Sequence, residues 1–208
     1  VKVNDQFAGL LYVSPTQINF LMPSGLQSGN ATIVIVAADG RVSQGSITIA
    51  PVAPGIITAN SDGLGVPAGS LLRIKSDEQQ LFEPISQVDP SSGKNIPLVI
   101  VPGNLNENLY LVLFGTGWRG RSSLDAVTAR IGGQAVPVAF AGPQGYYSGL
   151  DQLNVKIPKE LYGRGKVSLA LSIADVAISN SVELELGSPP GSSPPRIDTN
   201  VNGAILAG

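Results

Sequence analysis

Few residues in this sequence have the types and spacings that catalysis or metal binding requires. The chain contains no His and no Cys, which excludes Ser-His-Asp catalysis, imidazole and thiolate metal sites, and disulfides. General acid–base chemistry would therefore fall on carboxylates or Lys. The acidic residues are scattered, and Asp151 and Asp175 lie where turns or strand ends are expected. We predict no catalytic residue and no enzyme activity.

Two short motifs resemble parts of ligand-binding loops. Residues 60–63 (NSDG) match the start of an oxygen-ligand calcium loop, but no Glu follows at the spacing that such a loop needs. Residues 115–117 (GTG) follow a strand-like run and lack the rest of a phosphate-binding fingerprint. We interpret both motifs as turns, and we predict neither a metal nor a cofactor.

Aromatic side chains offer a third kind of chemistry, stacking against a sugar. Trp118 is followed by Arg119 and Arg121, and Tyr146 and Tyr147 are adjacent. A glycan platform needs exposed rings with polar neighbours, whereas a packed Trp and tyrosines in turns would be purely structural. Trp118, Tyr146 and Tyr147 are therefore candidate glycan contacts, and adhesion through a carbohydrate or a cell surface is the alternative function.

The segments that carry these residues contain a long internal repeat. Residues 17–23 (QINFLMP) recur 135 positions later as residues 152–158 (QLNVKIP), and residues 3–12 align with residues 131–140 at a shift of 128. The difference between the two shifts places a seven-residue insertion around residues 144–149 of the second copy. A repeat of this length indicates two modules of one fold.

The two copies are not equally complete. The match continues downstream, where residues 29–35 align with residues 165–171, but the second copy is preceded by a strand-like run at residues 109–114 (LYLVLF). The first copy begins at Val1, in the middle of the shared pattern, so nothing before it corresponds to residues 109–128. A β-module without its opening strand would expose an unpaired edge and part of its apolar core.

Composition favours strands over helices along the whole chain. Of the 208 residues, 43% are hydrophobic and only 13% are charged, with 25 Gly and 16 Pro, which is typical of short strands separated by turns. The dispersed charges sum to −2, and no apolar run approaches the roughly 18 residues of a membrane span. We therefore predict neither nucleic-acid binding nor membrane insertion. The predicted fold is all-β, with two immunoglobulin-like β-sandwich modules.

The predicted organisation has five parts. They are an incomplete immunoglobulin-like module (1–55), a connecting accessory hairpin region (56–108), a second immunoglobulin-like module (109–187), a linker rich in Pro, Ser and Gly (188–195) and a strand-like tail (196–208). The prolines of the linker favour an extended chain that cannot pack a core. The tail is therefore a separate apolar segment held on a tether.

Several uncommon motifs follow one another in a fixed order. They are residues 12–20 (YVSPTQINF), 53–58 (APGIIT), 113–117 (LFGTG), 131–133 (IGG), 141–145 (AGPQG) and 149–155 (GLDQLNV). With these motifs, residues 1–187 resemble the Solibacter-type C-terminal domain family, whose domains end large secreted proteins of acidobacteria and their neighbours. The resemblance implies modules of the IPT/TIG branch of immunoglobulin-like folds and an extracellular protein of the bacterial cell surface. It implies no activity.

The tail departs from the pattern of that family. Residues 197–208 (IDTNVNGAILAG) are similar to the segment with which its members begin, yet here the segment stands at the C-terminus. Three explanations are open: the chain is a slice of a longer repeat protein, the tail completes the first module of its own chain, or it completes the first module of a neighbouring subunit. A heterologous contact of the last kind, if it does not close, generates an open fibre.

We expect donation of the tail between subunits, because an open module and a tethered strand occur in one chain. A donated strand gains main-chain hydrogen bonds and buries alternate side chains. The predicted function is a non-enzymatic extracellular structural protein, a subunit of a surface filament whose partner is another copy of itself. The predicted donor residues are Ile197, Val201, Ile205 and Leu206. The predicted acceptor residues are Val1, Val3, Thr32, Val34 and Val36.

Overall fold

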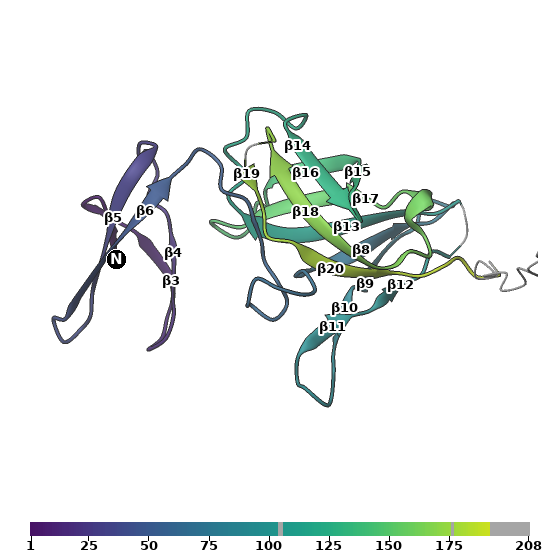
Figure 1. Ribbon diagram of the computed structural model, residues 1–208, viewed down its shortest axis with the longest axis horizontal. Helices are drawn as coiled ribbons and strands as arrows, with labels where there is room; N and C mark the ends of the chain where they lie inside the picture. Colours follow the sequence, from purple (N-terminus) through teal and green to yellow (C-terminus); the bar gives the residue numbers. More distant parts are fainter. Residues whose placement is uncertain (104–105, 176, 192–208) are drawn as a thin grey trace, which may run out of the picture.

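The computed structural model describes residues 1–103, 106–175 and 177–191 (Figure 1). These residues form strands, turns and one short 3₁₀ turn, η1 (Lys159–Leu161), so the all-β prediction is confirmed. No helix among them is long and apolar enough to cross a membrane. The predicted donor residues of the tail lie outside the described residues.

The first 49 residues form a small open unit, which we call module 1. Its strands are β1 (Lys2–Val3), β2 (Gln6–Phe7), β3 (Gly9–Val13), β4 (Ile18–Leu21), β5 (Gly29–Val36) and β6 (Val42–Ile49). Four of them form a sheet in the order β2-β1-β5-β6, and β3 and β4 form a separate hairpin. Val3 and Ala31 are the only fully buried hydrophobic residues of module 1, so this unit has almost no closed core.

The described residues from Gly55 onward form a larger unit, the body, built from two six-stranded sheets. The first sheet contains β7 (Gly55–Ile56), β8 (Gly69–Ile74), β9 (Gln80–Pro84), β13 (Asn108–Thr116), β16 (Val138–Pro143) and β17 (Asp151–Lys156). The second sheet contains β12 (Val99–Ile100), β14 (Val127–Ile131), β15 (Gln134–Val136), β18 (Gly165–Ile173), β19 (Ala177–Ile178) and β20 (Val182–Leu186). A small hairpin of β10 (Ser86–Val88) and β11 (Asn95–Pro97) projects from the body.

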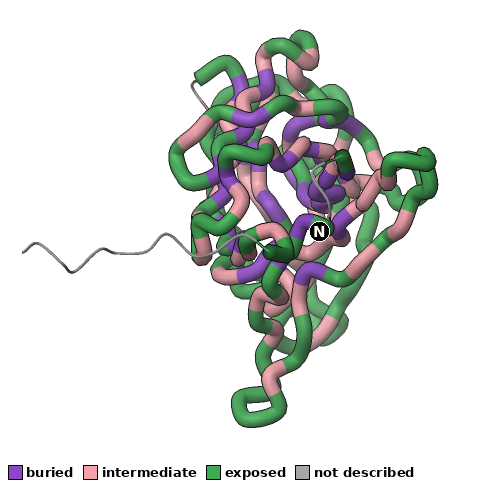
Figure 2. The backbone as a smooth tube through the Cα atoms, turned by 90° about the vertical axis from the view of Figure 1, so that its right-hand side faces the viewer, coloured by how far each residue is buried: buried purple, intermediate pink, exposed green. Residues whose placement is uncertain are grey.

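The two sheets of the body enclose one apolar core. Leu109, Leu111 and Leu113 of β13 are fully buried, and so are Leu153 and Val155 of β17. Alternate burial of this kind arises because successive side chains of a strand point to opposite faces of the sheet. Figure 2 shows the buried segments gathered inside the body, while the tip of the projecting hairpin is exposed.

The region predicted as a connecting hairpin, residues 56–108, takes part in both sheets. Strand β8 pairs with β13 on the side opposite to β17, and β9 extends the same sheet. Strand β12 pairs in parallel with β20 of the second sheet. The region therefore belongs to the body, and it makes β13 a central strand with a neighbour on each side.

The internal repeat extends to the pairing of the strands. The order β2-β1-β5-β6 in module 1 matches the order β15-β14-β18-β20 in the body. The β3–β4 hairpin contains a bulge between Leu10 and Tyr12, and β16–β17 contains one between Val138 and Phe140. These positions differ by the shift of 128 seen in the sequence. Strand β4 is thus the counterpart of β17, and β3 is the counterpart of β16.

Module 1 lies at one end of the molecule (Figure 1). The chain leaves β6 and enters the body at Gly55, which pairs with Thr116. Thr116 is the last residue of β13. Module 1 is therefore attached at the C-terminal end of β13.

The last described residues leave the body at the opposite end. Leu186 of β20 pairs with Ile100, and the next residue, Val101, accepts a hydrogen bond from Arg73. Arg73 pairs with Leu109, close to the N-terminal end of β13. The described part of the chain therefore ends near the end of β13 that is farther from module 1, as the yellow end of the ribbon shows in Figure 1.

Candidate functional site

The most distinctive feature of module 1 is the free edge of β4. In the body, β17 pairs with β16 on one side and with β13 on the other, where six residue pairs run from Tyr110–Lys156 to Gly115–Asp151. Among the described strands, β4 pairs with β3 alone. A free edge presents unpaired N–H and C=O groups, which form a template for another strand. Strand β4 thus lacks the neighbour that its counterpart has.

The apolar interior of module 1 is open beside this edge. Five of its positions are half-buried, whereas their counterparts in the body are at most 1% exposed. The pairs of counterparts are Ile18 and Leu153, Phe20 and Val155, Ile33 and Leu169, Ile47 and Leu184, and Ile49 and Leu186. Covering such side chains is favourable because apolar surface leaves water. Module 1 therefore has an unfinished core at the place where a strand is missing.

A groove of about 1220 Å³ runs along β4. Its lining includes Ile18, Phe20 and the end of β6 from module 1, and Arg119 and the loop residues 147–150 from the body. The loop approaches β4 closely, since a Cβ added at Gly149 would lie 2.8 Å from Cδ1 of Leu21. The groove is larger than the roughly 300–1,000 Å³ of small-molecule pockets. Its size and apolar wall suit a polypeptide segment.

The acceptor residues predicted from the sequence lie next to this site, in the other sheet of module 1. Val3 is buried, Val1, Thr32 and Val34 are half-buried, and Val36 is exposed. Strand β1 already pairs with both β2 and β5, and β5 pairs along its whole length with β6. Free edges lie on the outer strands β2, β3, β4 and β6, and β4 is the one whose counterpart pairs with β13 in the body. The repeated motif could have identified the edge of β4, because the sequence of β4 recurs in β17, and β17 lies beside the strand predicted at residues 109–114.

The candidate glycan contacts differ strongly in exposure. Trp118 is 0% exposed, and its indole Nε1–H donates a hydrogen bond to the carbonyl oxygen of Gln152 at 3.2 Å. This ring fills the core of the body and offers no face to a sugar. Tyr146 and Tyr147 are 91% and 71% exposed, and their backbone N–H groups both bond to Oε1 of Gln144. The two tyrosines are open to a ligand.

The carboxylate Asp151 supports the turn that follows β13. It is 0% exposed and accepts hydrogen bonds from the backbone N–H of Trp118 at 3.0 Å and from that of Arg119 at 3.3 Å. The Nε–H of Arg119 donates to its other oxygen at 2.8 Å. The buried charge is thus compensated by donors. The prediction of a turn at residues 115–117 is wrong for Gly115 and Thr116, which are the last two residues of β13, and the chain bends only from Gly117 onward.

The motif at residues 60–63 is also a turn. Oδ1 of Asp62 accepts hydrogen bonds from the backbone N–H of Leu64 at 3.0 Å and from the hydroxyl of Thr58 at 3.3 Å. The bond from Leu64 is the main reason why the pKa of Asp62 lies below its ordinary value. In the part of the chain that the structure describes, no three acidic side chains gather as they would to hold a metal.

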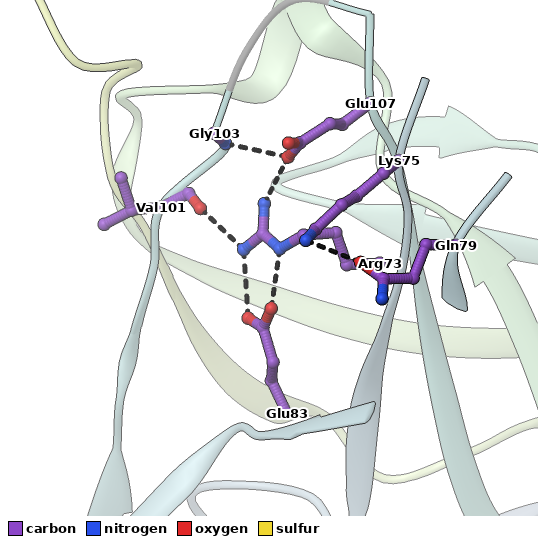
Figure 3. Close-up of polar contacts among 7 residues, drawn as sticks. All are labelled: Arg73, Lys75, Gln79, Glu83, Val101, Gly103 and Glu107. Atoms are coloured by element: carbon purple, nitrogen blue, oxygen red, sulfur yellow. Dashed lines mark hydrogen bonds and ion pairs between the residues drawn. The ribbon is translucent and has the colours of Figure 1, made fainter. Parts of the chain in front are cut away.

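A charged cluster that the sequence did not reveal lies at the tail end of the body (Figure 3). Arg73 donates to both oxygens of Glu83, at 2.6 and 2.9 Å, and to Oε2 of Glu107 at 2.7 Å. These bonds, those to Glu83 above all, raise the pKa of Arg73, and the bond from Arg73 lowers the pKa of Glu83. Oε2 of Glu107 also accepts from the backbone N–H of Gly103. The cluster fixes loops and leaves no free carboxylate for proton transfer.

The repeated Gln and Asn residues make the same contact in both copies. Nε2 of Gln17 donates to Oδ1 of Asn19 at 2.6 Å, and Nε2 of Gln152 donates to Oδ1 of Asn154 at 2.9 Å. In each copy the two side chains are two residues apart, so the bond is local to β4 and the residue before it, or to β17. The motif thus stabilises the outer face of β4 and of β17 alike.

Comparison of the chain with family models, curated proteins and solved structures gives no match. The open edge of β4, the unfinished core beside it and the groove are therefore the features from which a function can be inferred.

Proposed function

We propose that this chain is a non-enzymatic extracellular structural protein, a subunit of a bacterial surface filament joined by strand donation. The tail of one subunit completes module 1 of the next. The contrast between β4 and β17 carries this proposal, because the same strand has two neighbours in the body and one in module 1. In this proposal both units are immunoglobulin-like modules of the IPT/TIG branch, as in the Solibacter-type family that the sequence resembles.

The positions of the two ends favour donation between subunits over donation within one chain. The nine residues of β13 separate the attachment of module 1 from the departure of the tail by roughly 30 Å at about 3.3 Å per residue. Four residues, 192–195, lie between Gly191 and the tail, and they span at most about 14 Å. The first residues of the tail therefore fall short of the module 1 to which that chain is attached, so the tail cannot lie along that module from its start.

This arrangement produces an open assembly. The donor and the acceptor are different surfaces at opposite ends of one subunit, so the contact is heterologous. Each subunit that gains a donor still offers its own tail, and each that donates still offers its own groove. The assembly grows head to tail unless the geometry closes it into a ring.

Light scattering and negative-stain microscopy of the chain with and without residues 196–208 test this proposal. We expect fibres from the full chain, none from the truncated chain, and binding of a peptide of residues 196–208 to the truncated chain. Val201→Asp should also prevent assembly, whereas Val88→Asp, at a 60% exposed position of the projecting hairpin, is the matched control. A folded monomer from the full chain at all concentrations would refute strand donation.

Glycan binding is the second function that a specific observation favours. Tyr146 and Tyr147 are exposed beside the groove, and Tyr147 lines it. We propose that, if the chain is adhesive, this pair and not Trp118 provides the stacking rings. Binding to a glycan array that survives Tyr147→Ala would contradict that role, and loss of binding in the folded variant would support it.

A further inference from the structure

We infer that the acceptor of the tail is the free edge of β4 and that the occupant is residues 196–204 of a second copy, antiparallel to β4. This inference rests on the proposed function, since it names the site at which the proposed donation occurs. It moves the acceptor away from β1, which has β2 and β5 as neighbours, and from β5, which pairs with β6 along its whole length and with β1 at Ile33 and Val34.

The body contains a filled version of the site. There β13 lies antiparallel to β17, with Leu111 opposite Val155 and Leu113 opposite Leu153. One step earlier, the carbonyl oxygen of Leu109 accepts a hydrogen bond from the backbone N–H of Ile157 at 2.9 Å. Three leucines at alternate positions of β13 thus cover the inner face of β17, and each is fully buried. A strand on β4 needs the same alternation.

Because β4 repeats β17, the contacts of β17 show which residues of module 1 the occupant must lie opposite. At the shift of 135, Ile157, Val155 and Leu153 correspond to Met22, Phe20 and Ile18. Met22 is 40% exposed, and the other two are half-buried. The occupant must therefore bring three side chains, two residues apart, to lie opposite these three positions.

The tail contains such a set. Ile197, Thr199 and Val201 are two residues apart and would share one face of an extended strand. The offsets beyond them also agree with β13: Gly203 follows Ile197 by six positions, as Gly115 follows Leu109. The tail can therefore take the register of β13 with Ile197 in the place of Leu109.

Side-chain size supports the same register. The acceptor carries the larger Phe20 where β17 carries Val155, and the tail carries the smaller Thr199 where β13 carries Leu111. Protein interiors are close-packed, so an increase in volume on one side of a contact is best offset by a decrease on the other. Leu206 follows Gly203 by three positions, as Trp118 follows Gly115, which provides an apolar side chain for the end of the groove.

The other wall of the groove explains a further difference between the copies. The loop between β16 and β17 contains the seven-residue insertion of the second copy, and residues 147–150 of this loop face β4 across the groove. In the body, β13 has β8 as its second neighbour. The donated strand instead has β4 as its one neighbouring strand, and the loop, which approaches Leu21, borders the groove.

Disulfide trapping tests the site and the register. In the inferred register Asn200 takes the place of Val112, which pairs with Asn154, the counterpart of Asn19. Opposed Cβ atoms of antiparallel strands lie about 4.5–5.5 Å apart, within range of disulfide formation after small adjustments. The chain has no Cys of its own, so Asn19→Cys and Asn200→Cys, made in separate chains and mixed, can link only between subunits.

We expect oxidation of this mixture to produce covalent dimers that reducing agent separates. The control mixture pairs Asn200→Cys with Thr32→Cys, in the acceptor predicted from the sequence, and should give none. Fibres that link through Thr32→Cys but not Asn19→Cys would overturn the β4 site while leaving strand donation intact. Fibres that link through neither would overturn both the site and its register. A mixture that forms no fibres before oxidation would refute the proposed function itself.

Discussion

Strands β4 and β17 share a sequence motif, a bulged hairpin partner and an internal Gln–Asn hydrogen bond, yet only β17 is buried. Their sequences therefore determine local pairing equally well in both copies. The difference arises from β13, which lies beside β17 and has no counterpart beside β4 among the described strands. The sequence of a strand such as β4 or β17 therefore specifies one of its neighbours, whereas its burial depends on a strand from another part of the chain.

The largest expected difference between the copies concerns the core. Leu153→Ala should lower the free energy of unfolding of the body by about 2–5 kcal/mol, because it leaves a cavity among fully buried side chains. Ile18→Ala, at the corresponding position of β4, should cost only about 1 kcal/mol in the monomer because that side chain is half-buried. Urea unfolding of both variants measures the difference. Equal costs in the monomer would mean that module 1 is already closed.

The next effect concerns the turn after β13. Asp151→Asn removes the negative charge that accepts hydrogen bonds from Trp118 and Arg119, and hydrogen bonds to charged groups contribute about 1.5–3 kcal/mol. We expect a loss of that size in thermal unfolding of the body. Thr16→Ala, the corresponding change in module 1, should be nearly neutral because Thr16 is exposed. A neutral Asp151→Asn would show that the turn holds without the charge.

A smaller effect should be nearly equal in the two copies. Asn154→Ala and Asn19→Ala each remove the acceptor of one side-chain hydrogen bond, which is worth about 0.5–1.5 kcal/mol. The partly buried Asn154 should lie at the upper end of that range and the exposed Asn19 at the lower end. Hydrogen exchange of β17 and β4 would detect the local loosening. A larger loss of protection in Asn19→Ala than in Asn154→Ala would contradict the equivalence of the two hydrogen bonds.

The smallest effect is a dependence on acid. Arg73 holds the pKa of Glu83 below its ordinary value, so the ionised pair stabilises the body fully above that ordinary value and loses its contribution as the pH falls through the lowered pKa. We expect the free energy of unfolding to fall in this acid range, and less steeply in Arg73→Met.

The matched control for this pair lies in module 1. The backbone N–H of Arg41 and, second, its guanidinium lower the pKa of Asp39, but both side chains are mostly exposed, and exposed ion pairs contribute little. Arg41→Met should leave the acid dependence unchanged. A steeper change in Arg41→Met than in Arg73→Met, followed by circular dichroism across the acid range, would contradict this assignment.

Much of the fold follows from patterns that are local in the sequence. Alternating apolar residues and turn residues locate β3, β5 and β18, and the repeated motif relates β4 to β17. The identity of each strand's second neighbour is not local, which is why Val3 and Thr32 were predicted as acceptors although β1 and β5 each have two neighbours in module 1. The Arg73 cluster was equally hidden, because Glu83, Val101 and Glu107 come from three different segments.

The pairing of β20 has a mechanical consequence. Strand β20 is the last strand before the tail, and it is bonded to the antiparallel β18 on one side and to the parallel β12 on the other. A force that pulls the tail away along the direction of β20 loads the hydrogen bonds of both ladders together, in shear. Bonds loaded in this way must break together, whereas a strand pulled sideways would lose them one at a time. The ladders of β20 would therefore resist a pull along the strand at Leu186 better than a pull across it.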